Sequence, residues 1–348
     1  MATQRKEIHS KLPKRMLYTL LGLAFIIILF LLALYPMVIE RTQEDVIIRV
    51  PANASIENVS DTLTKYYGKG FSSKVTRLLK IRHIDFSKRH GAYLVPAGSN
   101  ALTAMRRIGR GGQTPLKITV NGFRDIDLLC KRIAAKLDFP ADSLRSILAD
   151  PVTLRAYGLT PEQALALFLD DTYEVYWSAS PREIVGKVGR NYLSYWNADN
   201  QRKVASLGIT PAEAMTIASI ADEETNNAGE KGTIARLYLN RLKKGMRLQA
   251  DPTVRFALKD FTIRRVKGEH LKVESPYNTY LHAGLPPGPI RTTSRATVDA
   301  LLDSPETNYL YMCAKEDFSG THNFASTFAE HSQNAARYRK ALNERGIK

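Results

Sequence analysis

The sequence predicts an α+β protein that is held in a membrane by one N-terminal helix. The first observation is an uncharged apolar segment over residues 16–39, which is long enough to cross the hydrocarbon core of a bilayer. The second is residues 46–115, where short β-branched runs alternate with helical patterns. The third is the mostly helical stretch over residues 116–345, which we expect to form a second, mixed α/β domain.

The chain has 348 residues and a formal net charge of +16. This length suits one anchor with one or two globular domains. A basic protein favours anionic partners, such as nucleic acid, anionic lipid or an acidic polymer. The basic residues are spread along the chain, however, and none of the compact nucleic-acid-binding motifs occurs. We therefore expect no nucleic-acid partner.

The N-terminal segment is predicted to be a retained anchor. Basic residues precede the span within residues 1–15, and positive flanks stay in the cytoplasm. A cleaved signal peptide is the alternative, but the apolar run ends in Tyr35-Pro36-Met37-Val38, which is a poor cleavage site. We expect a cytoplasmic tail over residues 1–15, a transmembrane helix over residues 16–39, and a single crossing of the cytoplasmic membrane with the rest outside.

The region over residues 46–115 is expected to be a compact α+β module. Ser55 is a good N-cap for the helix that follows it. Glycines at 109, 111 and 112 are expected to stop the last helix. The predicted elements are a strand at Val46–Val50, a helix from Ser55, a helix at Ser73–Ile81, a strand and turn at Gly91–Pro96 and a helix at Ala101–Ile108.

The second region is predicted to begin with a strand, Leu116–Val120, and helices at Ile126–Leu137 and Ala141–Leu148. Cys130 and Cys313 both lie in apolar runs. We expect two unconnected buried thiols, although an oxidising compartment would allow them to pair.

The strongest local signal is a helix that begins after Thr210. Thr210 is a good N-cap, Pro211 suits the first helical position, and Glu213 completes a capping box. A further helix is predicted over Ile234–Leu242 and closed by Gly245.

Glu224 is predicted to lie on the apolar face of the helix that Thr210 caps. It follows Ala221 by three residues and Ile217 by seven, so the three side chains share one face. Glu223 is expected to point into solvent, and Asp222 to lie at the margin. Desolvation raises the pKa of a carboxyl, and an acid protonated near neutral pH is what glycosidic cleavage requires.

Polar side chains after this helix are candidates for ligand contact. The segment Met246–Val254 presents the amide of Gln249, the carboxylate of Asp251 and the hydroxyl of Thr253, a set able to hold sugar hydroxyls and N-acetyl groups. His322 and His331 lie near each other in sequence. Without a third ligand we expect them to form ordinary hydrogen bonds, and we predict no metal site and no cofactor.

Several motifs together resemble the endolytic murein transglycosylase family, also described as YceG-like. Their order and spacing agree over the second half of the chain, and the first half agrees loosely. The motifs are Ala218–Thr225, Asn240–Leu242, Gly245–Val254, Tyr277–Tyr280 and Gly284–Ile290.

The resemblance implies a LysM-like module over residues 46–115 and a catalytic domain over residues 116–345 that cuts murein glycan strands internally. It places the catalytic glutamate at Glu224. Asp222 is a supporting acid and departs from the family's glutamate at that position. The implied substrate contacts are Gln249, Asp251, Thr253, Tyr277 and Asn278.

The same resemblance implies the reaction. Glu224 protonates the oxygen between N-acetylmuramic acid and N-acetylglucosamine, then takes the proton from the muramic acid C6 hydroxyl, which leaves a 1,6-anhydro end. Cutting nascent strands in this way would end their elongation. The implied partners are peptidoglycan strands, the membrane bilayer and cell-wall synthases, with the catalytic domain in the periplasm.

Two alternatives remain open at this point. One is a hydrolase that uses Glu224 with a second carboxylate, Asp222 or Asp251, because ordinary glycosidases need two. The other is a non-catalytic peptidoglycan-binding or division-scaffold protein in which the glutamate is structural.

Overall fold

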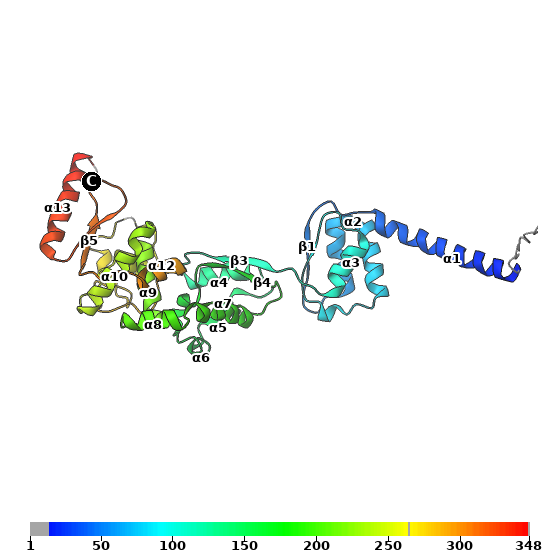
Figure 1. Ribbon diagram of the computed structural model, residues 1–348, viewed down its shortest axis with the longest axis horizontal. Helices are drawn as coiled ribbons and strands as arrows, with labels where there is room; N and C mark the ends of the chain where they lie inside the picture. Colours follow the sequence, from blue (N-terminus) through cyan, green and yellow to red (C-terminus); the bar gives the residue numbers. More distant parts are fainter. Residues whose placement is uncertain (1–13, 264, 347–348) are drawn as a thin grey trace, which may run out of the picture. The chain divides into compact units, whose positions relative to one another are not determined.

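The computed structural model describes residues 14–263 and 265–346, so most of the predicted tail over residues 1–15 lies outside the described residues. The chain mixes helices and strands, as the sequence predicts, and it divides into two compact units (Figure 1). One unit extends to Pro115 and includes Tyr176–Ser178, and the other holds Leu116–Val175 and the residues from Ala179 onward.

The predicted N-terminal apolar helix is present as α1, Lys14–Ile39. Within the described part of the chain, it is the one unbroken helix long and apolar enough to cross a membrane. Its large apolar side chains from Met16 to Leu32 are exposed. Near its end, Leu34 and Met37 pack against the core of the first unit. These properties are consistent with a single-pass anchor.

The first unit is a small α+β structure. Strand β1, Val46–Val50, pairs antiparallel with β2, Gly91–Val95, and two helices cover the pair, α2 over Ile56–Ile81 and α3 over Ala101–Arg110. Ser55 caps α2 as predicted.

Two helix predictions for this unit were wrong in detail. The helices expected after Ser55 and at Ser73–Ile81 are continuous except at Gly68, whose φ of 78° breaks the helical backbone. Helix α3 runs through Gly109 and ends at Gly111, which adopts a left-handed φ of 75°. A left-handed residue is what closes the helix, and Gly109 is not in that conformation.

The second unit is mostly helical, and its described strands form two antiparallel pairs, β3 with β4 and β5 with β6. The β3 strand and α5 match their predicted bounds, whereas α4 ends three residues before the predicted Leu137. The elements are β3 Leu116–Val120, α4 Ile126–Ala134, α5 Ala141–Leu148, α6 Pro151–Arg155, β4 Asp171–Val175, α7 Pro181–Tyr195, α8 Ala198–Ser206, α9 Pro211–Glu224, α10 Ala228–Lys243, α11 Asp251–Leu258, α12 Arg295–Leu302, β5 Tyr311–Ala314, β6 His322–Ala325 and α13 Phe328–Glu344.

Helix α9 is the central helix of the second unit. Thr210 and Glu213 form the predicted capping box at its start. Helices α8, α10, α11 and α12 pack around it, and side chains on all its sides are buried from Ala214 to Asp222. The prediction of one buried face was therefore wrong, and Asp222 is buried rather than marginal. Burial on all sides fixes the helix firmly in the unit.

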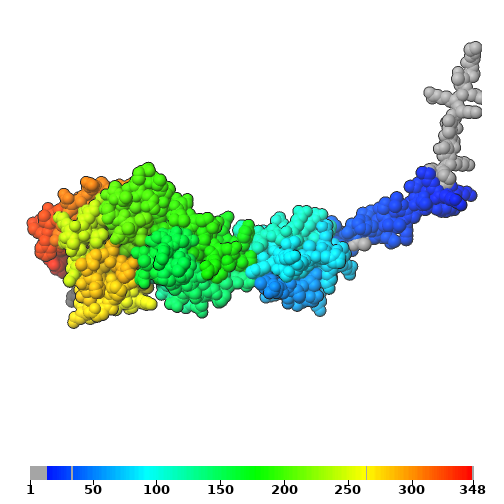
Figure 2. Space-filling model, turned by 90° about the horizontal axis from the view of Figure 1, so that it is seen from below, coloured from blue at the N-terminus to red at the C-terminus, as the bar shows by residue number. Residues whose placement is uncertain are grey.

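The C-terminal segment adds β5, β6 and α13, which pack mainly on one another. Figure 2 shows this segment, in orange and red, at the surface of the second unit. Cys313 of β5 is half-buried and Cys130 of α4 is buried, and both are free thiols. The expectation of two unconnected thiols agrees with the structure, but Cys313 is not a core residue.

Candidate active site

A cavity of about 390 Å³ lies at the C-terminal end of α9. Segments that are far apart in the sequence line it: the end of α9, one side of α10, the turn before α11, strand β5 and the start of α13. The lining residues are Glu224, Leu237, Tyr238, Arg241, Leu248, Gln249, Asp251, Tyr280, Tyr311, Met312, Phe328 and His331.

Glu224 is the last residue of α9, so the rigid central helix presents its carboxyl to the cavity. Burial raises the pKa of Glu224 to about 7, and the negative charge of Asp251 acts in the same direction. A hydrogen bond from Tyr238 and the charge of Arg255 act against that shift. Near neutral pH the protonated and the ionised carboxyl are therefore both accessible, and it can serve both as an acid and as a base.

Tyr238 determines which oxygen of Glu224 carries the acidic proton. Its hydroxyl donates to Oε1 of Glu224 over 2.6 Å, and burial raises the pKa of Tyr238 well above its ordinary value. The tyrosine therefore stays a donor, and the proton of the neutral acid belongs on Oε2. Tyr238 thus orients the carboxyl and also stabilises its ionised form.

Replacing Tyr238 by phenylalanine is expected to move the alkaline limb of kcat/KM, for a reaction in which Glu224 is the acid, to higher pH by roughly one unit. The hydrogen bond lowers the pKa of Glu224, so its loss raises that pKa further above 7. Rate–pH profiles would measure the shift. Tyr173→Phe is the control, because it removes a buried hydroxyl that donates to Leu169 outside the cavity. An unmoved limb in Tyr238→Phe would contradict the assignment of Glu224 as the titrating acid.

Arg241 is a buried cation that hydrogen-bonds to two segments around the cavity, the loop before α11 and the residue before β5. Its guanidinium donates to the carbonyl oxygen of Arg247 over 3.0 Å, to that of Leu310 over 2.9 Å and to Oε1 of Gln249 over 2.6 Å. All three acceptors are neutral. The bond to Gln249 holds a residue whose backbone is left-handed, with a φ of 52°. Arg241 therefore maintains the shape of the cavity at its turn and at β5.

Two of the five predicted substrate contacts line the cavity. Gln249 lies beside Arg241, and Asp251, which begins α11, accepts a hydrogen bond of 2.6 Å from the Tyr280 hydroxyl. Only Ala250 separates the two residues, and both side chains line the same cavity as Glu224.

The structure does not bring the other three to this cavity. Thr253 is fully buried and donates to the carbonyl of Ala250 over 2.7 Å. Asn278 is also fully buried and donates to two backbone carbonyls in the loop before it. Tyr277 packs on Phe256, with ring centres 4.6 Å apart, beside a different cavity. Thr253 and Asn278 thus stabilise loops through satisfied hydrogen bonds.

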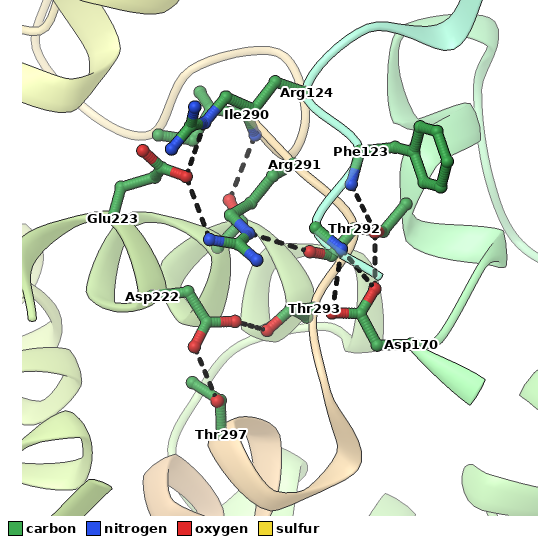
Figure 3. A network of polar contacts seen from close by, with 12 residues as sticks. Phe123, Arg124, Asp170, Asp222, Glu223, Ile290, Arg291, Thr292, Thr293 and Thr297 are labelled. Atoms are coloured by element: carbon green, nitrogen blue, oxygen red, sulfur yellow. Dashed lines mark hydrogen bonds and ion pairs between the residues drawn. The ribbon is translucent and has the colours of Figure 1, made fainter. Parts of the chain in front are cut away.

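Glu223 does not point into solvent, and that prediction was wrong. Its side chain is only 6% exposed, and Oε1 accepts from Arg124 over 2.8 Å and from Arg291 over 3.0 Å (Figure 3). Both arginines come from loops distant in the sequence, which helical periodicity could not reveal. Glu223 therefore ties the end of α9 to two loops.

Asp222 lies in a second part of the same network. Its carboxylate accepts from the Thr297 hydroxyl over 2.7 Å and from Thr293 (Figure 3). It also accepts from Lys231 over 2.6 Å. Nearby, Asp170 accepts from Thr292 and from the backbone of Gly122. The carboxylate of Asp222 is fully engaged inside the protein, so it supports the helix that carries Glu224.

Sequence reasoning missed five residues of the cavity as functional candidates, namely Tyr238, Arg241, Tyr280, Tyr311 and Phe328. His331 was expected to form ordinary hydrogen bonds, but its buried Nδ1 has no partner among the described residues. Tyr238 and Arg241 are three residues apart on α10, a spacing that places them on one helical face. That signal was available, but the sequence does not show that this face meets Glu224.

The chain is similar to known proteins over most of its length. The model of a family described as the YceG-like family matches residues 48–337. A protein of Bacillus subtilis named endolytic murein transglycosylase is 35% identical over 162 residues, which is 46% of this chain and 42% of the relative. A protein of Streptococcus pneumoniae with the same name is 24% identical over 160 residues, 45% of this chain and 28% of the relative. The matched segment thus spans less than half the length of either relative.

A solved structure of a YceG-like protein from Listeria monocytogenes has a similar fold. Its TM-score is 0.54 and its identity to this chain 25%, over 83% of this chain and 98% of that one.

Proposed function

The chain belongs to the YceG-like family, and from that premise we propose that it is an endolytic murein transglycosylase, a lyase that cleaves peptidoglycan strands internally. The observation that carries the proposal is Glu224, a carboxyl whose pKa is raised to about 7, presented to a cavity by a buried helix and oriented by Tyr238.

In the first step, Oε2 of Glu224 donates its proton to the glycosidic oxygen between N-acetylmuramic acid and N-acetylglucosamine. The C1–O bond breaks, the N-acetylglucosamine leaves with a new hydroxyl, and positive charge develops at C1. Glu224 becomes a carboxylate at the same moment, and the hydrogen bond from Tyr238 stabilises that charge.

In the second step, the Glu224 carboxylate takes the proton of the muramic acid C6 hydroxyl as its oxygen bonds to C1. The product is a 1,6-anhydro end, and Glu224 regains its proton. No water enters the reaction and no second carboxylate is required. A pKa near 7 suits both steps, because donor and acceptor forms are then close in free energy.

Gln249 and Asp251 are the substrate contacts that we retain in this proposal. The amide of Gln249 and the carboxylate of Asp251 line the same cavity as Glu224, and they can hold hydroxyl and N-acetyl groups of the sugar. Thr253, Tyr277 and Asn278 support the surrounding loops.

Hydrolysis with a second carboxylate is the alternative that one observation favours, because Asp251 lies in the same cavity as Glu224. Asp222 does not support it, since its oxygens are engaged with Lys231, Thr293 and Thr297.

Mass spectrometry of isolated glycan strands digested by the detergent-solubilised chain tests the proposal. We expect fragments that end in 1,6-anhydro-N-acetylmuramic acid, lighter by one water than reducing ends. Internal cutting should shorten long strands early in the digestion. Reducing ends alone would establish the hydrolase, and intact strands would favour the non-catalytic scaffold.

We also propose that α1 anchors the protein once in the cytoplasmic membrane, N-terminus inside, with a LysM-like first unit and the catalytic unit in the periplasm beside cell-wall synthases. The support is the basic flank and apolar length of the span. We expect activity from a reporter enzyme that works only outside the cytoplasm when it is fused after Lys348. An inactive reporter would indicate the opposite orientation.

A further inference from the structure

Three rings from the C-terminal segment form one cluster on the wall of the Glu224 cavity. Tyr311 of β5 stacks on His331 of α13 with ring centres 5.3 Å apart. Phe328, at the start of α13, lies 6.0 Å from Tyr311 and 6.2 Å from His331. All three line the cavity. The geometry places an aromatic surface beside the reacting carboxyl.

The cluster is held in place from the interior of the protein. The Arg241 guanidinium lies 5.7 Å from the Tyr311 ring centre and donates to the carbonyl of Leu310, the residue just before it. Strand pairing places Tyr311 opposite Ala325 and fixes its backbone. Tyr311 is therefore positioned before any ligand arrives, so little ordering is required on binding.

Phe328 is the exposed member of the cluster. Its side chain is 68% exposed, more than nearly every other large apolar side chain of the second unit. Thr327, not Phe328, caps α13, so the phenyl ring has no evident part in starting the helix. Because Phe328 also lines the cavity, its exposed ring is available to pack on the apolar part of a bound ligand.

His331 adds a polar group to this apolar surface. Its Nδ1 is buried and has no hydrogen-bond partner among the described residues. Burial and the charge of Arg241 lower the pKa of His331, so the ring is neutral at pH 7. A buried N–H without an acceptor is rarer than a buried acceptor without a donor, which puts the hydrogen on Nε2. The ring thus carries an N–H donor available for a ligand oxygen.

We propose that Tyr311, Phe328 and His331 form a sugar subsite next to Glu224, in which Phe328 packs on the C–H face of an N-acetylated pyranose and His331 donates to one of its oxygens. This inference rests on the proposed function and deepens it. The electron-rich face of an aromatic ring attracts the weakly positive C–H groups of the sugar. The subsite contributes binding free energy that holds the strand in the cavity that contains Glu224.

The subsite is tested without cleavage in the full chain carrying Glu224→Gln. Calorimetric titration with N-acetylglucosamine tetrasaccharide measures its binding affinity. Phe328→Ala and His331→Ala are each expected to weaken binding about 3–10-fold, as for the loss of one aromatic or hydrogen-bonded contact. Phe328→Trp should keep the affinity and Phe328→Leu should not. With Glu224 present, Phe328→Ala should raise KM for isolated glycan and leave kcat nearly unchanged.

Phe261→Ala is the matched control. Phe261 is also a partly exposed phenylalanine of the second unit, but it lies over Arg124 beside a different cavity, so its loss should leave binding unchanged. Unaltered binding in both Phe328→Ala and His331→Ala, or full affinity in Phe328→Leu, would overturn the subsite. If the chain binds the sugar through Phe328 yet cleaves no glycan, the proposed function fails and the subsite remains.

Discussion

Replacing Glu224 by glutamine is expected to lower the rate of glycan cleavage by roughly 10²–10⁴-fold or more, the usual contribution of general acid catalysis. Glutamine keeps the size of the side chain and an oxygen that can accept from Tyr238, but it has no proton to donate. The same residue also acts as the base in our mechanism, so one substitution removes both steps. The loss of cleavage rate is measured by monitoring the release of anhydro ends from isolated glycan with mass spectrometry.

The thermal stability of the same variant separates lost chemistry from lost folding. The pKa of Glu224 in the folded chain, about 7, lies above its ordinary value of 4.5. As pH rises from 4.5 to 7, the unfolded chain releases this proton first, so the carboxyl progressively destabilises the fold. Glutamine avoids that effect. We expect Glu224→Gln to match the parent at pH 4 and to melt at a higher temperature at pH 8. A variant that melts lower at both values while losing activity would indicate misfolding.

Replacing Asp222 by asparagine is expected to destabilise the second unit by about 3–5 kcal/mol, the usual effect of removing one partner from a buried ion pair. The Asp222 side chain is 4% exposed and its partner Lys231 only 21%, so the lysine would lose its counterion away from water. The midpoint of thermal unfolding should fall by roughly 6–20 °C for a unit of this size. Calorimetry or circular dichroism at neutral pH measures the change.

A second substitution in the pair provides the control. Lys231→Met added to Asp222→Asn removes both charges and should recover much of the stability. Cleavage should recover with it, because Asp222 acts through the position of α9. If Asp222→Asn abolished cleavage and left thermal stability unchanged, Asp222 would instead have a direct chemical role. Glu223→Gln is expected to be milder, because Arg124 remains partly exposed.

Local signals in the sequence were sufficient to predict where several elements begin and end. The capping box of Thr210 and Glu213 determines the start of α9, and its side chains bond only to their neighbours. The strand Leu116–Val120 and the helix Ala141–Leu148 were also predicted with the bounds that the structure has. Such signals can be read from the sequence because the residues that define a helix end lie within a few positions of it.

The surroundings of the three acids could not be read in the same way. Helical periodicity assigns faces only where one side of a helix meets solvent, and α9 is buried on all sides. The partners of Glu223 are Arg124 and Arg291, which are 99 and 68 residues away in the chain. The sequence singled out Glu224 because it falls on an apolar face, a property that neighbouring residues share. What distinguishes Glu224 in the structure is the cavity at the end of the helix.

Arg241 holds two other segments of the chain through three acceptors, and this limits which substitutions those acceptors tolerate. Its charge is buried and its donors are divided among Arg247, Gln249 and Leu310, so lysine, with one point charge and no planar fork, cannot replace it. Gln249 supplies the one side-chain acceptor of the three, on a strained backbone. A change at position 249 would leave a buried donor of Arg241 without its acceptor, so we expect the two positions to vary together as lineages diverge. The other two acceptors are backbone carbonyls, which any residue provides, so positions 247 and 310 are free of this constraint.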